Sequence, residues 1–327
     1  MTITAMGIDV SKKTLDVCIL LGGRSVQRKF SNNSVGFEEL GGLLKKLAIE
    51  KAHVCMESTG RYWEAVAIHL HEVGHLISVV PPARIKGYGQ GEFKRTKTDK
   101  ADAAMIARFC EKHSPLVWTP PEPEEANLKE LERHLFCIKK MMVEERNRLE
   151  AGAMAPLVVA AIHRHIEFLD TQKHEMETAI RKLIKETAHM AAAKKLIVSI
   201  KGIGETTAAV FLGEVGSIAK FQHVRQLDAF AGLDVTERLS GTSVHGKPHI
   251  SKAGSKRLRT ALYMPALSAM RFNPLIKRFV ERLKQRGKLP KKVIICAVMR
   301  KLLHLIYGVL KTGIAFDSNY GMQAATQ

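Results

Sequence analysis

The sequence predicts a mixed α/β domain at the N-terminus, then a helical stalk, then a mainly helical and basic C-terminal domain. Three observations predict this order. The first 112 residues alternate short apolar runs with amphipathic segments, the following segments repeat apolar residues every three or four positions, and the last third carries most of the net positive charge. A chain of 327 residues is long enough for several domains. We expect them at residues 1–123, 124–190 and 191–327.

The N-terminal domain is expected to contain five strands. Gly22 and Gly23 predict a hairpin turn between the second and third strands. The expected strands are 3–10, 17–21, 25–30, 53–57 and 76–80, and the expected helices start near Gly36 and cover 62–71 and 99–112. Three strands thus come first, followed by alternating helices and strands. This order is that of an RNase H-like (RuvC-like) fold.

The stalk is expected to consist of two long helices. Each carries a narrow apolar seam with a heptad-like rhythm, and the short segment 152–156 separates them. The first seam comprises Leu128, Leu131, Leu135, Ile138, Met142 and Leu149, and the second comprises Ile162, Ile166, Leu169, Met176, Ile180 and Leu183. Such seams fit either a hairpin within one chain or a coiled coil between chains. We favour oligomerisation, because so narrow a stalk adds little to the core of a monomer.

The charge predicts a polyanionic partner. The chain has 51 Lys and Arg against 32 Asp and Glu, and residues 244–292 hold fourteen of those cations and one acid. A solvated face usually mixes both signs, so this window is the expected nucleic-acid surface. No signal peptide or apolar run long enough to span a membrane is evident, and five scattered cysteines suggest neither disulfides nor a zinc site. We expect a cytoplasmic protein with no membrane partner.

Four carboxylates are the candidate catalytic residues. Asp9 ends the first expected strand and Glu57 ends the fourth, and these strands are neighbours in an RNase H-like sheet. Asp99 and Asp102 are three residues apart at the start of a helix, so they share one face. Singly, each acid fits a turn, a cap or a first helical turn. Together they predict a site for two Mg²⁺ ions, the arrangement that cuts phosphodiesters, with Mn²⁺ able to substitute.

Three other segments are candidate contacts with nucleic acid. A glycine-rich basic loop is expected at 86–97, just before the Asp99 helix. A Gly-x-Gly hairpin at 200–207 resembles a helix-hairpin-helix element, which binds phosphate through backbone N–H groups. A plain turn between two packed helices fits this hairpin equally well. The third segment is the basic window. The expected nucleic-acid-binding residues are Lys94, Arg95, Lys97, Lys201, Gly202, Gly204, Lys247, Lys252, Lys256, Arg257 and Arg259.

A polar loop at 239–247 enters the basic window and could supply a nucleophile. A hydroxyl there could attack a phosphodiester if its proton were removed. Composition alone does not choose among Ser240, Thr242, Ser243 and Ser251, and serines in such loops commonly cap helices or turns.

Six motifs together resemble one known family. They are GIDVS at 7–11, ESTG at 57–60, KTDKAD at 97–102, SIKGIG at 199–204, AFAGLDVTERLSGTSVHG at 229–246 and SKAGSKRLRTALYMPA at 251–266. In these motifs the chain resembles the IS110 family of insertion-sequence transposases, and the resemblance spans nearly its whole length. It implies a RuvC-like domain with a DEDD metal site, a coiled coil and a transposase domain with a nucleophilic serine.

The resemblance assigns roles residue by residue. It implies that Asp9, Glu57, Asp99 and Asp102 bind the metal and that Ser240 is the nucleophile, with Thr242 and Ser243 close enough for a register error to matter. It also implies donor and target DNA and a bridge RNA as partners. The active form would be a dimer or tetramer in which the acids of one subunit and the serine of another complete a site, with base pairing reading the sequence.

Three other functions share some of these features. A sugar kinase also begins with a Gly-Ile-Asp strand, but it needs a second phosphate-binding hairpin and an adenosine pocket, which the sequence does not show. A Holliday-junction resolvase or nuclease would use the acids without a serine. A nucleic-acid chaperone would need the charge alone. Covalent capture of DNA separates the recombinase from all three.

Overall fold

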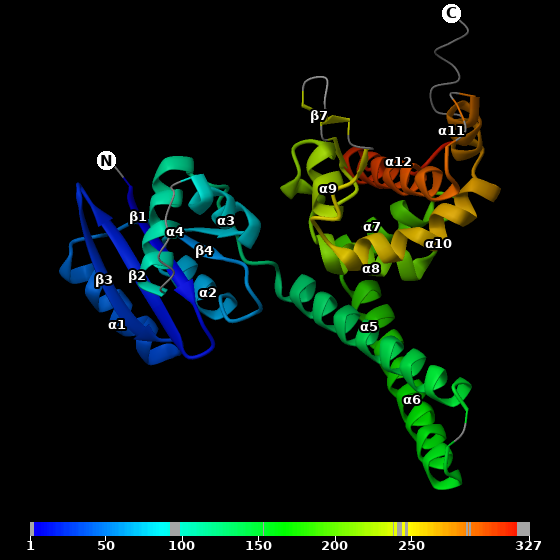
Figure 1. Ribbon diagram of the computed structural model, residues 1–327, viewed down its shortest axis with the longest axis horizontal. Coiled ribbons are helices and arrows are strands. Elements are labelled where there is room, and N and C mark those ends of the chain that lie inside the picture. The colour runs from blue at the N-terminus through cyan, green and yellow to red at the C-terminus, as the bar shows by residue number, and fades with distance from the viewer. Residues whose placement is uncertain are drawn as a thin grey trace, which may run out of the picture. The chain divides into compact units, whose positions relative to one another are not determined.

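The computed structural model describes residues 3–91, 99–152, 154–237, 239–240, 244–245, 248–285, 287 and 289–318, and it describes only the backbone of 99–100, 239–240 and 244–245. The chain divides into two compact units, which we call the N-terminal unit (residues 1–120) and the helical unit (residues 121–327). Figure 1 shows the elements of each.

The N-terminal unit is built on a five-stranded sheet in the order β3-β2-β1-β4-β5. Its strands are β1 (Thr4–Val10), β2 (Thr14–Leu21), β3 (Arg24–Ser31), β4 (Ala52–Glu57) and β5 (Leu76–Val80). The first three are antiparallel neighbours, whereas β4 runs parallel to both β1 and β5. This mixed topology confirms the predicted RNase H-like, RuvC-like arrangement.

Helices cover both faces of this sheet. The helices α1 (Ser34–Lys46) and α2 (Glu64–Glu72) bury one face with an apolar core that includes Phe37, Leu40, Val66 and Leu70. The helices α3 (Pro82–Gly91) and α4 (Asp99–His113) lie on the opposite face (Figure 1). The sheet is therefore buried on both sides, which explains the continuous apolar runs in its central strands.

The helix α3 corrects the expectation of a loop at 86–97. Residues 86–91 are helical, while 92–98 lie outside the described residues. Pro82 fits the first turn of a helix, where its missing N–H costs nothing. A side chain at Gly89 would place its Cβ 2.5 Å from Met105 Sδ of α4, so this glycine allows close packing of two helices. Of the glycines at 87, 89 and 91, Gly89 thus serves helix packing, whereas Cβ atoms at the other two would meet nothing within 4 Å.

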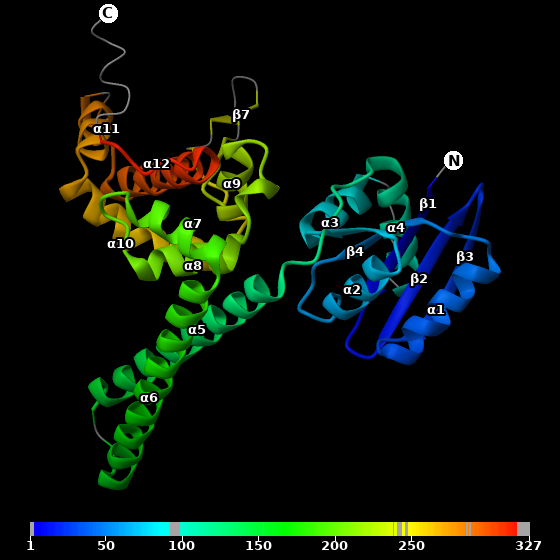
Figure 2. The same ribbon diagram turned by 180° about the vertical axis from the view of Figure 1, so that it is seen from behind.

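The helical unit contains eight α-helices in its described part, and Figure 2 shows it from behind. They are α5 (Pro123–Glu150), α6 (Pro156–Glu186), α7 (Ala188–Val198), α8 (Glu205–Val215), α9 (Val224–Ala231), α10 (Lys256–Phe272), α11 (Pro274–Gln285) and α12 (Lys291–Thr312), with a 3-10 turn η1 (Ile218–Lys220). Four two-residue strands interrupt them, namely β6 (Val235–Thr236), β7 (Leu239–Ser240), β8 (Val244–His245) and β9 (His249–Ile250). Such short strands have too few residues to show an alternating pattern.

The two seams expected in the stalk are filled within one chain. The long helices α5 and α6 pack against each other (Figures 1 and 2). Within a single chain, the side chains of Leu135, Ile138 and Leu169 are buried, with exposed fractions of 4%, 0% and 1%. The sequence left a hairpin and an intermolecular coiled coil open and favoured the coiled coil, whereas these side chains serve the hairpin. Any contact between chains would therefore use other side chains.

The helix α12 forms much of the core of the helical unit. In the described part of the chain, it is the helix whose length and composition would also suit a membrane span. Its apolar side chains, including Val298, Leu302 and Ile306, are fully buried against the neighbouring helices. A buried core position accounts for this composition.

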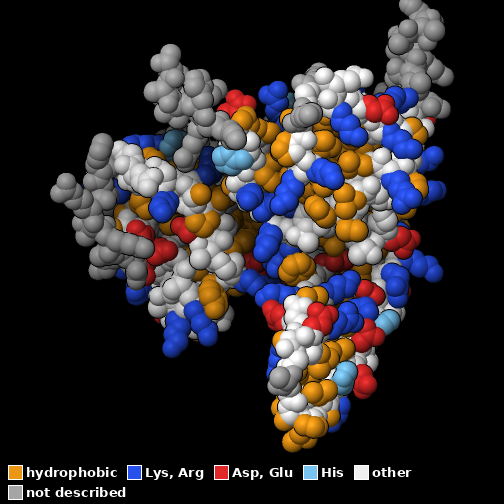
Figure 3. Space-filling view, turned by 45° about the vertical axis from the view of Figure 1, so that its right-hand side comes forward, with side chains coloured by type: hydrophobic (Ala, Val, Ile, Leu, Met, Phe, Trp, Pro, Cys, Tyr) orange, Lys and Arg blue, Asp and Glu red, His pale blue; other side chains and the backbone are white. Residues whose placement is uncertain are grey.

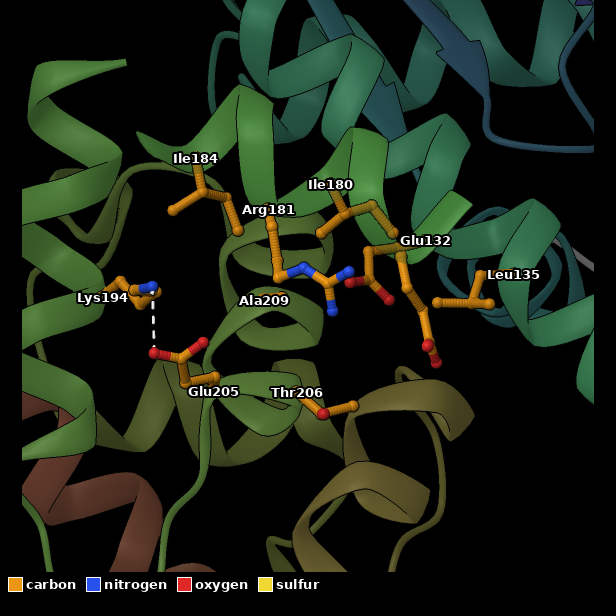
Figure 4. A pocket seen from close by; sticks show the side chains of 10 residues that line it. Glu132, Leu135, Ile180, Arg181, Ile184, Lys194, Glu205, Thr206 and Ala209 are labelled. Carbon is orange, nitrogen blue, oxygen red and sulfur yellow. Dashed lines mark hydrogen bonds and ion pairs between the residues drawn. The ribbon is translucent and has the colours of Figure 1, made fainter. Parts of the chain in front are cut away.

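A small cavity with a buried acid lies where α5 and α6 meet α8. It has a volume of about 130 Å³, and Glu132, Arg181 and Thr206 line it (Figure 4). The Glu132 side chain is only 6% exposed. Burial raises the pKa of Glu132 to about 7, and the carboxylates of Glu177 and Glu214 add to this effect while Lys139 opposes it.

We expect Glu132→Gln to stabilise the helical unit at alkaline pH. The unfolded chain ionises Glu132 near its ordinary pKa of 4.5, whereas the folded chain resists ionisation up to about pH 7. Stability should therefore fall as the pH rises from 4.5 through 7, by up to about 3 kcal/mol. Glu132→Gln has no carboxylate to ionise at this position, so its stability should not fall in this way. Urea unfolding followed by circular dichroism between pH 4.5 and 8 would measure it.

Glu175→Gln is the matched control, because Glu175 is an exposed acid on α6. It should leave the pH dependence as it is in the parent protein. Equal stability of Glu132→Gln and the parent at pH 8 would contradict the assignment of a costly buried charge to Glu132.

Candidate active site

Three of the four predicted acids line one cleft in the N-terminal unit. The cleft has a volume of about 620 Å³, and its walls include Asp9 from β1, Glu57 from β4 and Asp102 from α4. The sequence placed these residues at one edge of the sheet, and the structure brings them to the same cleft.

Strand pairing explains why Asp9 and Glu57 meet. β1 and β4 are parallel neighbours with Ile8 opposite Met56, so Asp9 and Glu57 follow at the next position of each strand. The Thr59 hydroxyl donates a 2.6 Å hydrogen bond to Glu57 Oε1. Thr59 therefore orients the carboxylate, a role that the sequence analysis missed although Thr59 lies within the ESTG motif.

A close helix–strand approach places Asp102 at the same cleft. A side chain at Gly7 would put its Cβ 2.2 Å from the backbone N of Ala107 and 2.3 Å from the backbone O of Ala103. Only glycine therefore lets α4 lie directly on β1. Because Ala103 touches β1 two residues before Asp9, the adjoining Asp102 is carried toward the strand end. Gly7 is thus a structural requirement of the site.

The fourth acid, Asp99, is placed by its backbone only. It begins α4 three residues before Asp102, so the two share a helix face, but its side chain lies outside the description. Among the described side chains, no group of three His, Cys, Asp or Glu comes close enough to hold a metal ion. Asp9, Glu57 and Asp102 nevertheless offer the hard oxygen ligands that suit Mg²⁺, in one cleft with room for a substrate.

A fifth carboxylate near the site was missed by the sequence analysis. Asp16 lies directly opposite Asp9 on β2, so both residues stand on the same face of the sheet. Asp16 is 5% exposed and forms a 3.1 Å ion pair with Lys29 of β3. Lys29 therefore neutralises the buried neighbour of Asp9. The cleft also includes Lys86 and Gln90 of α3, which the sequence placed in a loop.

The predicted nucleophile lies in a separate arm of the helical unit. We define the arm as residues 235–250, whose strands pair β6 with β9 and β7 with β8. Ser240 is the last residue of β7 and pairs with Val244, but its side chain is not described, and Thr242 and Ser243 lie outside the described residues.

The base of the arm is closed by Asp234 and Ser251. The Ser251 backbone N donates to Asp234 O at 2.9 Å, and the Ser251 hydroxyl donates a short hydrogen bond to Asp234 Oδ1. Ser251 was one of four hydroxyls that composition left open as a nucleophile. Its hydrogen bond to Asp234 gives this hydroxyl a structural role, which is to join the two ends of the arm.

The Gly-x-Gly hairpin joins α7 to α8. Gly202 has a φ of +106°, and a Cβ there would lie 2.7 Å from Ala269 Cβ of α10. Asn273 Nδ2 donates to Lys201 O at 3.0 Å, which fixes the hairpin against the end of α10. Gly204 precedes α8 and gives its first N–H groups no side-chain cap. Gly202 thus serves packing, whereas a Cβ at Gly204 would meet nothing within 4 Å, and phosphate binding by this hairpin stays a prediction.

The predicted basic residues divide into three groups. Lys94, Arg95, Lys97 and Lys247 lie outside the described residues. Lys201, Lys252 and Lys256 are exposed. Lys and Arg side chains are spread over the face of the helical unit that Figure 3 shows.

Arg257 and Arg259 are committed to contacts within the chain. Arg257 lies 3.6 Å from the buried Glu214 and over the ring of Phe136. Arg259 Nη1 donates to Ala231 O at 2.8 Å and Gly254 O at 3.1 Å. Removing these charges would therefore disturb the fold as well as any nucleic-acid surface.

Comparisons with known proteins give two family models and a full-length relative. A family model described as transposase, of the DEDD type of IS110 elements, matches residues 6–153, and one described as transposase IS116/IS110/IS902 family matches residues 194–281. The chain is 34% identical to the pilin gene-inverting protein of Moraxella bovis over 97% of this chain and 98% of that protein.

Two further comparisons are more distant. The transposase for insertion sequence element IS1111A of Coxiella burnetii is 25% identical over 82% of this chain and 78% of that protein. A structure of T. thermophilus RuvC in complex with a Holliday junction aligns with 36% of this chain and all of that chain, at 12% identity and a TM-score of 0.28. The full-length relative and the two family models agree in what they identify: this chain belongs to the IS110 family of transposases.

Proposed function

We propose that this protein cuts and rejoins DNA strands through a covalent bond between Ser240 and DNA. The observation that carries the proposal is the convergence of Asp9, Glu57 and Asp102 on one cleft, in a chain that also presents a serine arm in a second unit. A resolvase or nuclease would need the acids alone, whereas an arm held by its own strand pairs and by the Asp234–Ser251 contact suits the presentation of a nucleophile.

The reaction conserves the energy of the phosphodiester bond. Ser240 Oγ forms a bond to phosphorus, the bond from phosphorus to the departing deoxyribose oxygen breaks, and the serine proton is lost as that oxygen gains one. A hydroxyl of a new strand then attacks the same phosphorus and releases Ser240. Strands are thus exchanged without ATP.

The acids would hold Mg²⁺ beside the reacting phosphate. Asp9, Glu57 and Asp102 provide carboxylate oxygens from three different elements, Thr59 fixes the orientation of Glu57, and Asp99 adds a fourth carboxylate by its place on α4. When bound, Mg²⁺ supplies positive charge that neutralises the phosphodiester. Mn²⁺ has similar ligand preferences and should substitute.

We infer that the partners are donor DNA, target DNA and a bridge RNA, and that the active form is a dimer or tetramer. The formal charge of +19 supports binding of more than one nucleic acid. Exposed apolar side chains on the paired helices α5 and α6, such as Val143 and Phe168 at 53% and 58% exposure, support contact with a second copy. One subunit would supply the acids and another the serine.

Site-specific inversion is a second candidate function. The relative from Moraxella bovis is named a pilin gene-inverting protein and matches nearly the whole chain. Inversion requires the same cutting and rejoining at two sites, so it would use the same residues with a different arrangement of DNA.

Copurification tests the proposal. The protein would be expressed together with the non-coding DNA that flanks its gene, and the bound RNA would be sequenced. We expect one RNA from the flanking DNA to be enriched, and a reporter plasmid carrying the same flanks to recombine. Recombination without any bound RNA would remove the guide from the account, while absence of both recombination and DNA cleavage would contradict it altogether.

A further inference from the structure

A buried carboxylate joins α9 to α12 in the helical unit. Asp228 of α9 is 1% exposed, and Arg300 Nε donates to its Oδ2 at 2.7 Å. His304 Nε2 lies 2.9 Å from the same oxygen and 3.1 Å from Oδ1. Arg300 and His304 are one helical turn apart, so Asp228 holds both side chains on one face of α12.

The outer atoms of Arg300 and His304 remain available. Within the described part of the chain, both side chains bond only to Asp228, through Arg300 Nε and His304 Nε2. The two terminal nitrogens of the guanidinium and Nδ1 of the imidazole are therefore open to a ligand. The side chains are 35% and 32% exposed, so these atoms can be reached from solvent.

This arrangement suits a phosphate group. A guanidinium presents a planar fork of N–H donors that matches two phosphate oxygens, and a protonated imidazole adds a donor. Ordinary surface arginines lose side-chain entropy when they bind, whereas Asp228 already fixes the direction of both side chains. A purely structural contact between α9 and α12 would not need these open donors. Apolar packing would also join the two helices about as well, because buried ion pairs add little net stability over it.

The same helix supports the arm that carries Ser240. Gly232 caps the C-terminus of α9, and its carbonyl accepts from Lys252 N at 3.1 Å. The carbonyl of Phe230 in α9 accepts from Ser255 N at 2.8 Å. The chain thus leaves α9 into the arm and returns to it. A phosphate held by Arg300 and His304 beside Asp228 would therefore lie next to the helix that anchors both ends of the arm.

We propose that Asp228, Arg300 and His304 form a phosphate clamp, which binds a backbone phosphodiester of the nucleic acid on the helical unit. Arg300 and His304 contact the phosphate, and Asp228 is a positioning residue. The inference rests on the proposed function in one respect, that the helical unit binds nucleic acid.

Asp228→Asn gives the sharpest test, because simple electrostatics predicts the opposite result. Removing a negative charge should strengthen binding of a polyanion, whereas loss of the carboxylate that orients the clamp should weaken it about tenfold and lower the salt dependence by about one phosphate contact. Fluorescence anisotropy of the full chain would be measured over a series of salt concentrations, with labelled duplex DNA and separately with a labelled RNA hairpin.

Two further variants keep the test decisive. Arg300→Lys retains the charge and can still pair with Asp228 but loses the fork, so it should also weaken binding about tenfold. It decides the matter if circular dichroism shows that Asp228→Asn does not fold. Glu281→Gln removes an exposed acid of α11 and is the matched control, with binding equal to or tighter than that of the parent.

The outcomes separate the clamp from the proposed function. Weaker binding of only one nucleic acid identifies that one as the occupant and supports the clamp. Parental affinity in both Asp228→Asn and Arg300→Lys, with the parent binding well, overturns the clamp and leaves the proposed function standing. A parent protein that binds neither DNA nor RNA contradicts both.

Discussion

Ser240→Ala should abolish strand exchange and the protein–DNA adduct while leaving DNA binding intact. The variant loses only the oxygen that would bond to phosphorus, and Ser240 lies in the two-residue strand β7 of the arm rather than in the apolar core. We expect recombination to fall at least about a thousandfold, to the background of the assay, as for other enzymes that lose a covalent nucleophile. Recombination of a reporter plasmid and denaturing gels of the DNA would measure both effects.

Ser243→Ala is the matched control for this experiment, because it removes the same atom three residues away. It should recombine like the parent. An adduct that survives in Ser240→Ala and disappears in Ser243→Ala would move the nucleophile to Ser243 and leave the mechanism standing. If no adduct forms under any condition, the resolvase interpretation replaces the recombinase.

Loss of one carboxylate from the cleft should have a comparably large effect. Glu57→Gln and Asp102→Asn each remove a ligand charge from a site that we expect to hold Mg²⁺, so DNA cleavage should fall at least about a hundredfold. DNA binding should be unchanged or slightly tighter, because a negative charge is removed beside a polyanion. Chelation of Mg²⁺ should stop cleavage by the parent protein, and added Mn²⁺ should restore it.

Glu38→Gln controls for general effects of removing an acid from this unit. Glu38 is exposed on α1, which packs on the face of the sheet opposite to α4. It should cleave like the parent. Parental cleavage by Glu57→Gln and Asp102→Asn, with both variants folded, would show that the cleft is not the metal site.

Features in which a local pattern is tied to topology could be predicted from the sequence. The order of strands and helices identified the RNase H-like sheet, and that sheet has only one way to place the ends of its first and fourth strands. The proximity of Asp9 and Glu57 could therefore be predicted from the sequence. The second strand was expected to begin at Val17, but it begins at Thr14. The earlier start was missed because Thr14 and Asp16 are polar, and the sequence does not show that Asp16 is buried.

Three of the misses share a physical cause, which is contact between residues far apart in the chain. α3 was missed because glycines at 87, 89 and 91 suggest a loop, and Gly89 is explained only by Met105 of α4. The cluster of Asp228, Arg300 and His304 joins residues 72 and 76 positions apart, and no spacing rule connects them. Arg257 and Arg259 were taken as surface cations because sequence does not show Glu214 or the carbonyl groups they bind.

Identification of the amino acid that becomes joined to DNA tests the central claim most directly. The parent protein would be incubated with Mg²⁺ and a substrate nicked beside the scissile bond, so that the released strand end diffuses away and the adduct accumulates. Protease digestion and mass spectrometry would then locate the nucleotide. The account predicts a phosphodiester on Ser240, formed only when Mg²⁺ is present and Asp9, Glu57 and Asp102 are intact. Cleaved DNA with no nucleotide on any peptide would contradict it.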